Sequence, residues 1–94
     1  MKVTYTEEAV ADMVQAITYL NERSPTAAAK LDADIGRCIK RLADREFEGP
    51  VSRLRSGTVV RSWGAPPFRI YYQRQSDELI ILRVYHQSRR SITR

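Results

Sequence analysis

Several residue types that build common functional sites are scarce in this chain. Its 94 residues include one cysteine, Cys38, and one histidine, His86. A single cysteine excludes an internal disulfide and a cysteine-based zinc site, and a single histidine excludes a site that uses two histidine ligands. We therefore expect no metal and no other cofactor.

Long apolar runs are also absent. No stretch approaches the ~20 apolar residues that a membrane-spanning helix needs. The opening segment MKVTYTEEAV has no apolar signal-peptide core. We expect a cytoplasmic protein without membrane contacts, folded as a single domain over residues 1–94.

Lysine and acidic residues are nearly missing from the second half. Residues 1–49 carry seven Lys or Arg and nine Asp or Glu, for a net charge of −2. Residues 50–94 carry nine Arg, no Lys and only Asp77 and Glu78 as acids, for a net charge of +7. Arginine presents a planar fork that suits carboxylates and phosphates. The second half therefore predicts an anionic partner, which could be nucleic acid, an enzyme acting on nucleic acid, or an acidic protein.

The first half contains the signals of two helices. Thr6 is a suitable N-cap, and apolar residues at helical spacing predict a helix over residues 7–22. Ser24 is a second N-cap, and Pro25 suits a first helical position, which predicts another helix over residues 25–44. The short linker makes the two helices antiparallel neighbours.

After Gly49 and Pro50 the apolar period changes to two. The segments TVVRSW, FRIYYQR and LIILRVY predict strands, with turns at GAPP and QSDE. Together with the β-prone opening KVTYT, they predict the order β-α-α-β-β-β. This is an α+β fold in which the N-terminal helical hairpin packs on one face of a small antiparallel sheet.

Strand alternation predicts which side chains share a face of the sheet. The most apolar sets are assigned to the helices, with Ile80, Leu82, Val84 and His86 together on the core side. The opposite face then collects Arg61, Trp63, Arg69, Tyr71, Arg83 and Tyr85. Such a mixture suits nucleic acid or a protein hot spot, although a solvated face with cross-strand stacking would look the same.

His86 attracts attention as a catalyst because it is unique. A general acid or base needs a partner within reach, and none is visible nearby in the sequence. The chain also has no nucleophile-elbow motif and no glycine-rich phosphate loop. A structural role for His86 is therefore favoured over a catalytic one, and both alternatives stay open.

Several segments resemble one family when they are taken together. They are the SP-x-AA helix start at residues 24–28, the strands VVRSW and FRIYY, and the closing ILRVYHQSRR. In this order they are similar to the ParE/RelE superfamily of type II toxin–antitoxin toxins. The resemblance implies the β-α-α-β-β-β fold, growth inhibition linked to plasmid stabilization, and a cognate antitoxin that wraps the toxin.

The resemblance implies one of two activities. RelE-like members are ribosome-dependent mRNA endonucleases, and on that alternative the ribosome and mRNA are the partners. The residues implied for cleavage are then Arg61, Arg69 and Arg83 on the phosphate and His86 as acid or base. ParE-like members inhibit DNA gyrase by binding, without catalytic residues of their own.

The end of the chain favours the ParE-like branch. Val84, His86 and Arg89 form a V-x-H-x-x-R ending that is similar to the ParE type. No aromatic residue follows Tyr85, where RelE-like nucleases usually carry a tyrosine. The chain is therefore interpreted as a gyrase inhibitor that acts by binding, and the mRNA endonuclease stays open as the alternative.

The partners follow from this interpretation. We expect a ParD-like antitoxin whose acidic C-terminal segment folds on binding and inserts apolar anchors beside the helical hairpin. The expected contacts with gyrase are Arg61, Trp63, Arg69, Tyr71, Arg83, Tyr85, His86, Arg89 and Arg90.

Overall fold

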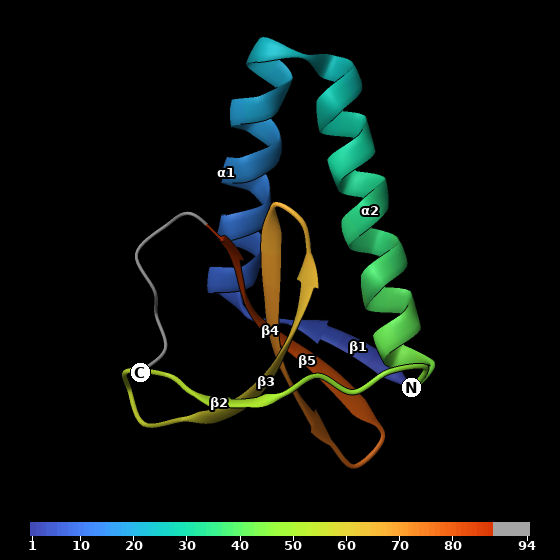
Figure 1. The fold of residues 1–94 in the computed structure, drawn as a ribbon, viewed down its shortest axis with the longest axis vertical. Helices are drawn as coiled ribbons and strands as arrows, with labels where there is room; N and C mark the ends of the chain where they lie inside the picture. Colours follow the sequence, from blue (N-terminus) through green and yellow to red (C-terminus); the bar gives the residue numbers. More distant parts are fainter. Residues whose placement is uncertain (88–94) are drawn as a thin grey trace.

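The computed structural model describes residues 1–87 of the chain. Its elements, in chain order, are β1 (Lys2–Tyr5), α1 (Glu7–Arg23), α2 (Pro25–Ala43), β2 (Val51–Arg53), β3 (Val59–Ala65), β4 (Phe68–Gln75) and β5 (Glu78–His86). The two helices run side by side and extend well beyond the sheet, which gathers near their lower ends (Figure 1). The predicted α+β fold class is confirmed. No helix within the described residues is both long and apolar enough to cross a membrane.

The helix starts follow the capping residues. The Thr6 hydroxyl accepts a hydrogen bond from the Ala9 amide at 3.1 Å, and the Ser24 hydroxyl accepts one from the Ala27 amide at 3.2 Å. Each bond satisfies an amide that has no partner within its own helix. Both predicted helix starts are confirmed, and each helix ends within one residue of its predicted last position.

The sheet has five strands in the order β1-β5-β4-β3-β2. β1 runs parallel to β5, and the other neighbouring strands are antiparallel. The strand β2 was not predicted, because three residues after Gly49 and Pro50 are too few to show an alternating pattern. The order along the chain therefore gains one short edge strand beside β3.

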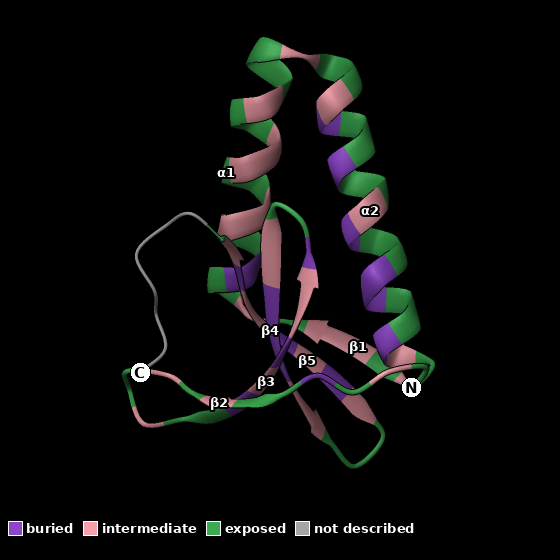
Figure 2. Cartoon of the chain, in the orientation of Figure 1, coloured by how far each residue is buried: buried purple, intermediate pink, exposed green. Residues whose placement is uncertain are grey.

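The core lies between the helices and the facing side of the sheet. Buried positions, shown in purple in Figure 2, form a stripe along α2 that faces the middle of the strands. The side chains with at most 5% exposure that build this core include Leu31, Ile35, Ile39, Leu42, Ile70, Tyr72, Leu79, Ile81 and Val84.

A bulge in β5 changes the predicted alternation. Tyr71 of β4 is paired with Arg83, whereas the next residue, Tyr72, is paired with Ile81, so Leu82 is an extra residue. An extra residue reverses which side chains face the core on one side of the bulge. The prediction that Ile80 and Leu82 share the core side with Val84 is therefore wrong, because Leu79 and Ile81 are fully buried instead.

The predicted faces of β3 also need a correction. Trp63 is paired with Ile70 and Arg61 with Tyr72, and both partners belong to the helix-facing side. Arg61 and Trp63 therefore do not lie on the face opposite the helices. The prediction assigned Val60 to the core side because it is apolar, and Val60 is indeed buried at 2% exposure, but on the other face.

Candidate functional site

Four of the predicted contact residues form a compact group on the face opposite the helices. In the β4–β5 ladder Arg69 is paired with Tyr85, and Tyr71 is paired with Arg83. Arginine and tyrosine therefore alternate both along each strand and across the pair. We call Arg69, Tyr71, Arg83 and Tyr85 the arginine–tyrosine quartet. The Arg83 guanidinium lies over the Tyr85 ring, 4.4 Å from its centroid, which is a cation–π contact.

One member of the quartet is held from the helical layer. The Asp12 carboxylate accepts hydrogen bonds from Arg83 Nε at 2.8 Å and from Arg83 Nη2 at 3.0 Å. This hydrogen bonding raises the pKa of Arg83 above its usual value, so the guanidinium stays charged. The pair fixes the orientation of a side chain that the sequence predicts as a contact residue.

The side chains of α1 and its cap also complete the outer edge of β5. β1 pairs with β5 only as far as Ile81. Beyond that point Thr6 Oγ1 donates to the Leu82 carbonyl at 2.8 Å, and the Val84 amide donates to Asp12 at 3.0 Å. The bulge at Leu82 is thus satisfied by side chains from another element, as a buried polar backbone requires.

A second candidate site is a cavity of about 460 Å³ between the helical hairpin and the β3–β4 turn. His86 lines it from the end of β5, and its ring meets the Phe68 ring edge-on at 5.2 Å. The predicted place of His86 on the core side is confirmed by its pairing with Phe68. The other lining residues are Asp12, Gln15, Ala16, Tyr19, Leu20, Ala27, Lys30, Leu31, Asp34, Pro66, Pro67 and Val84.

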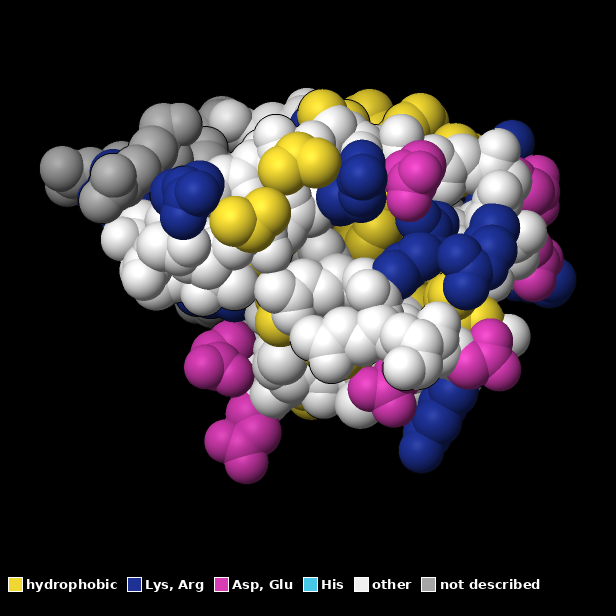
Figure 3. Space-filling view, turned by 90° about the horizontal axis from the view of Figure 1, so that it is seen from below, with side chains coloured by type: hydrophobic (Ala, Val, Ile, Leu, Met, Phe, Trp, Pro, Cys, Tyr) yellow, Lys and Arg dark blue, Asp and Glu magenta, His cyan; other side chains and the backbone are white. Residues whose placement is uncertain are grey.

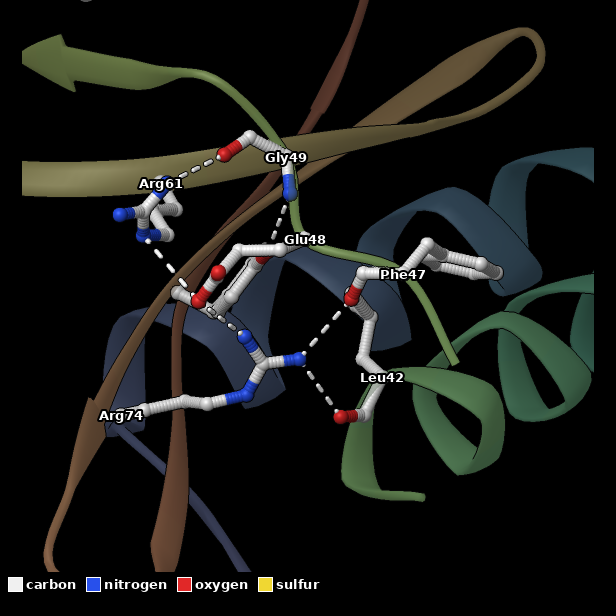
Figure 4. A network of polar contacts seen from close by, with 7 residues as sticks. Leu42, Phe47, Glu48, Gly49, Arg61 and Arg74 are labelled. Carbon is white, nitrogen blue, oxygen red and sulfur yellow. Dashed lines mark hydrogen bonds and ion pairs between the residues drawn. The ribbon is translucent and has the colours of Figure 1, made fainter. Parts of the chain in front are cut away.

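Arg61 takes part in a polar network around the loop between α2 and β2, drawn in Figure 4. Its Nη1 donates to the Gly49 carbonyl at 2.8 Å, and Glu48 lies 3.6 Å from its Nε. Glu48 also pairs with Arg74 at 2.9 Å. Arg61 is therefore engaged with this loop and not with the quartet.

Arg74 ties the same loop to the end of α2. Its Nη2 donates to the carbonyls of Leu42, at 2.8 Å, and Phe47, at 3.1 Å. The Phe47 ring in turn stacks on Trp63, with the ring centroids 4.1 Å apart. Trp63, predicted as a contact residue, thus packs beside the core on the helix-facing side.

The structure brings some predicted site residues together and separates others. Arg69 and Arg83 lie on one face of the sheet with the two quartet tyrosines, whereas Arg61 and His86 lie on the other face. Arg89 and Arg90 fall outside the described residues.

Sequence reasoning missed Asp12 and Arg74. Asp12 interrupts the apolar stripe of α1 close to its buried side, which was a usable signal for a buried partner of an arginine. Arg74 gave no such signal, because its partners are the backbone carbonyls of Leu42 at the end of α2 and Phe47 in the following loop, and any residue type supplies a carbonyl. Within residues 1–87 no three Asp, Glu, His or Cys side chains gather closely enough to bind a metal ion.

Comparison with known proteins gives the family. The model of the family described as "ParE toxin of type II toxin-antitoxin system, parDE" matches residues 3–91. This chain belongs to the ParE toxin family. As a ParE-type toxin it is one component of a type II toxin–antitoxin system, which confirms the family expected from the sequence.

A solved structure has the same ParE-like fold. The structure described as the chromosomal ParDE TA system from P. aeruginosa is 24% identical to this chain and superposes with a TM-score of 0.73. The match covers 92% of this chain and 95% of the other. A comparison with curated protein sequences gives no match.

Proposed function

We propose that this ParE-type toxin inhibits DNA gyrase by binding it, and that a ParD-like antitoxin neutralises it. Gyrase as the target comes from the ParE-like branch that the chain end resembles. The proposed binding surface for the target is the quartet, in which Arg69, Arg83 and Tyr85 are partly exposed and Tyr71 is buried at 8% exposure. Arginine and tyrosine are enriched in protein hot spots, and arginine suits anionic partners.

The observation that carries this proposal is the separation of the residues that RNA cleavage would need. Arg69 and Arg83 lie on one face of the sheet, and Arg61 and His86 lie on the other. Groups that stabilise a phosphate and transfer its protons must converge on the same atoms. Arg61, Arg69 and Arg83 instead bond to three different partners, which are the Gly49 carbonyl, the Ser62 hydroxyl and the Asp12 carboxylate. Because these cations do not converge on His86, the arrangement supports a binding protein over an mRNA endonuclease.

The cavity beside the helical hairpin supports the antitoxin part of the proposal. Its walls are mainly apolar, and it opens next to Tyr19, whose side chain is 56% exposed. Val10 and Val14 add exposed apolar surface on α1, at 45% and 59% exposure. An amphipathic antitoxin segment can place apolar side chains in the cavity, and a stretch that continues around α1 can cover Val10 and Val14 on the other side of this helix.

Purified gyrase and supercoiled plasmid test the target. We expect the toxin to block supercoiling and to trap gyrase on cleaved DNA. Translating ribosomes with a defined mRNA are assayed in parallel, and the mRNA is expected to stay intact. Normal supercoiling at a large excess of toxin would refute the gyrase proposal, and cleaved mRNA would restore the nuclease alternative.

Isothermal titration with the product of the neighbouring gene tests the antitoxin. Ala27→Phe fills the cavity and is expected to weaken binding roughly tenfold or more, as loss of a buried anchor does. Ala29→Phe is the matched control, because Ala29 is exposed on the same helix and does not line the cavity. Equal affinities for both variants would place the antitoxin elsewhere on the toxin.

A further inference from the structure

A second group of exposed side chains lies where the helices no longer cover the sheet. Val51 is paired with Arg61 and Arg53 with Val59, so that valine and arginine alternate across β2 and β3. We call these four residues the valine–arginine patch. It lies on the helix-facing side, yet Val51 is 58% exposed and Val59 is 47% exposed. Exposed branched apolar side chains that alternate with cations form a potential contact surface for another molecule.

The patch borders an open edge of the sheet. β2 is the last strand in the sheet order. The Ser62 amide donates to the Pro50 carbonyl at 3.2 Å, so Pro50 bonds inward to β3. Because hydrogen-bonding directions alternate along an antiparallel strand, the amides and carbonyls of Val51 and Arg53 point away from β3. Such an edge can accept an added strand.

The charge of the surroundings defines the partner. Residues 49–76 contain no Asp or Glu, while Arg53, Arg55 and Arg61 all lie in or beside the patch. The nearest acid is Glu48, which Arg61 already shares with another arginine. Viewed from below, Lys and Arg side chains lie among hydrophobic ones, and Asp and Glu side chains lie mostly around the rim of the same face (Figure 3). A complementary partner must therefore be acidic.

Two other occupants fit less well. Nucleic acid is held through phosphates and stacked bases, and it makes little use of Val51 and Val59. A second copy of the chain would bring two sets of patch arginines together without intervening acids, which opposes edge-to-edge pairing. The valines and the free strand edge favour an extended segment of protein.

We propose that the valine–arginine patch docks an extended acidic segment of the protein that the toxin inhibits, added as a strand beside β2. This inference rests on the proposed function and gives the toxin a contact with its target beyond the quartet. The cavity assigned to the antitoxin lies at the β3–β4 turn, at the opposite end of β3 from the β2–β3 turn. Arg61, the patch residue nearer the β3–β4 turn, is four residues from Ala65 at the end of β3, so roughly 13 Å separates the two sites.

The patch is tested by reversing one charge at its edge of the sheet and, as a control, one charge at the opposite edge. Arg53→Glu changes the patch, and Lys2→Glu makes the same change in charge on β1, the opposite edge strand. We expect Arg53→Glu to weaken gyrase binding and inhibition about tenfold and Lys2→Glu to have little effect. Antitoxin affinity should stay within about twofold for both variants. If Arg53→Glu inhibits gyrase as well as the wild type does, or weakens only the antitoxin, the proposal is wrong.

The strand edge is tested by the backbone of Val51. Val51→Pro removes an amide that points away from β3, whereas Val51→Thr keeps it and has a similar shape. A greater loss of gyrase binding for proline than for threonine supports strand addition, and equal binding refutes it. A DNA duplex of about 20 base pairs serves as the nucleic-acid probe. If Arg53→Glu weakens only the binding of this duplex and leaves gyrase binding unchanged, a protein occupant is refuted. Wild-type toxin that leaves gyrase unaffected would instead refute the proposed function itself.

Discussion

Asp12 of α1 and Arg83 of β5 are 71 residues apart in the sequence and form a two-point ion pair, with N–O distances of 2.8 and 3.0 Å. The side chains are largely buried, with 10% of Asp12 and 29% of Arg83 exposed. The same carboxylate accepts the Val84 amide directly after the bulge. One acidic side chain therefore joins the helical hairpin to the strand that carries half of the quartet.

Asp12→Ala is expected to lower the free energy of unfolding by about 2 kcal/mol, because it leaves a partly buried guanidinium and a backbone amide without their acceptor. Urea denaturation measures the change. Asp34→Ala is the control, since Asp34 forms only exposed pairs with Lys30 and Arg37, which are worth about 0–1 kcal/mol. Equal destabilisation by the two substitutions would show that the Asp12–Arg83 pair contributes no more to the free energy of unfolding than an exposed ion pair does.

Gly49 and Gly36 are expected to respond in opposite directions to the same substitution. A Cβ at Gly49 would overlap the Ser62 carbonyl, and the backbone there already bonds Tyr72 and Arg61. Gly49→Ala must therefore displace the loop, at a cost of roughly 2 kcal/mol or more.

Gly36 lies within α2, and a Cβ there would meet no atom within 4 Å. Gly36→Ala should stabilise the protein by about 1 kcal/mol through helix propensity. Thermal unfolding of the two variants measures both effects. Stabilisation by Gly49→Ala would contradict the close approach of the loop to β3.

The thiol of Cys38 is expected to react slowly in the folded protein. Burial on α2 raises the pKa of this thiol above its ordinary value, which keeps it protonated where an unfolded chain would form the reactive thiolate. Labelling with a disulfide reagent at about pH 8 should be at least roughly tenfold slower in native protein than in concentrated urea. Equal rates would mean that Cys38 is accessible.

The same shift predicts a pH dependence of stability. The folded state holds the Cys38 proton more tightly than the unfolded state, so this contribution is complete below the unfolded pKa. It is lost as the pH rises through the unfolded and then the folded pKa. Denaturation midpoints should therefore fall more steeply above about pH 8 for the wild type than for Cys38→Ala.

The fold could be predicted where local signals are strong. Thr6 and Ser24 act through hydrogen bonds three residues away, so the sequence alone locates both helix starts. The quartet was also predicted, because Arg69, Tyr71, Arg83 and Tyr85 all lie on the same side of the β5 bulge, where simple alternation holds.

The errors come from features that depend on distant residues. The bulge at Leu82 is stabilised by Thr6 and Asp12, which are far away in the sequence, so alternation along β5 alone could not reveal it. Arg61 and Trp63 were placed on the wrong face because their partners lie in the α2–β2 loop. Arg61 donates to the Gly49 carbonyl, and Trp63 stacks on Phe47. The hydrophobicity pattern within β3 does not reveal these contacts.

Arg69 offers the clearest test of the quartet, because no acid holds it in the described part of the chain. Its Nε donates to the Ser62 hydroxyl at 3.0 Å, which keeps the side chain over the sheet. Arg69→Ala should weaken gyrase inhibition about tenfold, as loss of a hot-spot arginine does. Arg37→Ala removes an exposed arginine from α2 and should inhibit like the wild type. Far-ultraviolet circular dichroism checks that both variants are folded, and antitoxin titration checks that the hairpin cavity is intact. If both variants inhibit gyrase equally, the face with the quartet does not contact the target, and the cations of the second half must act through another surface.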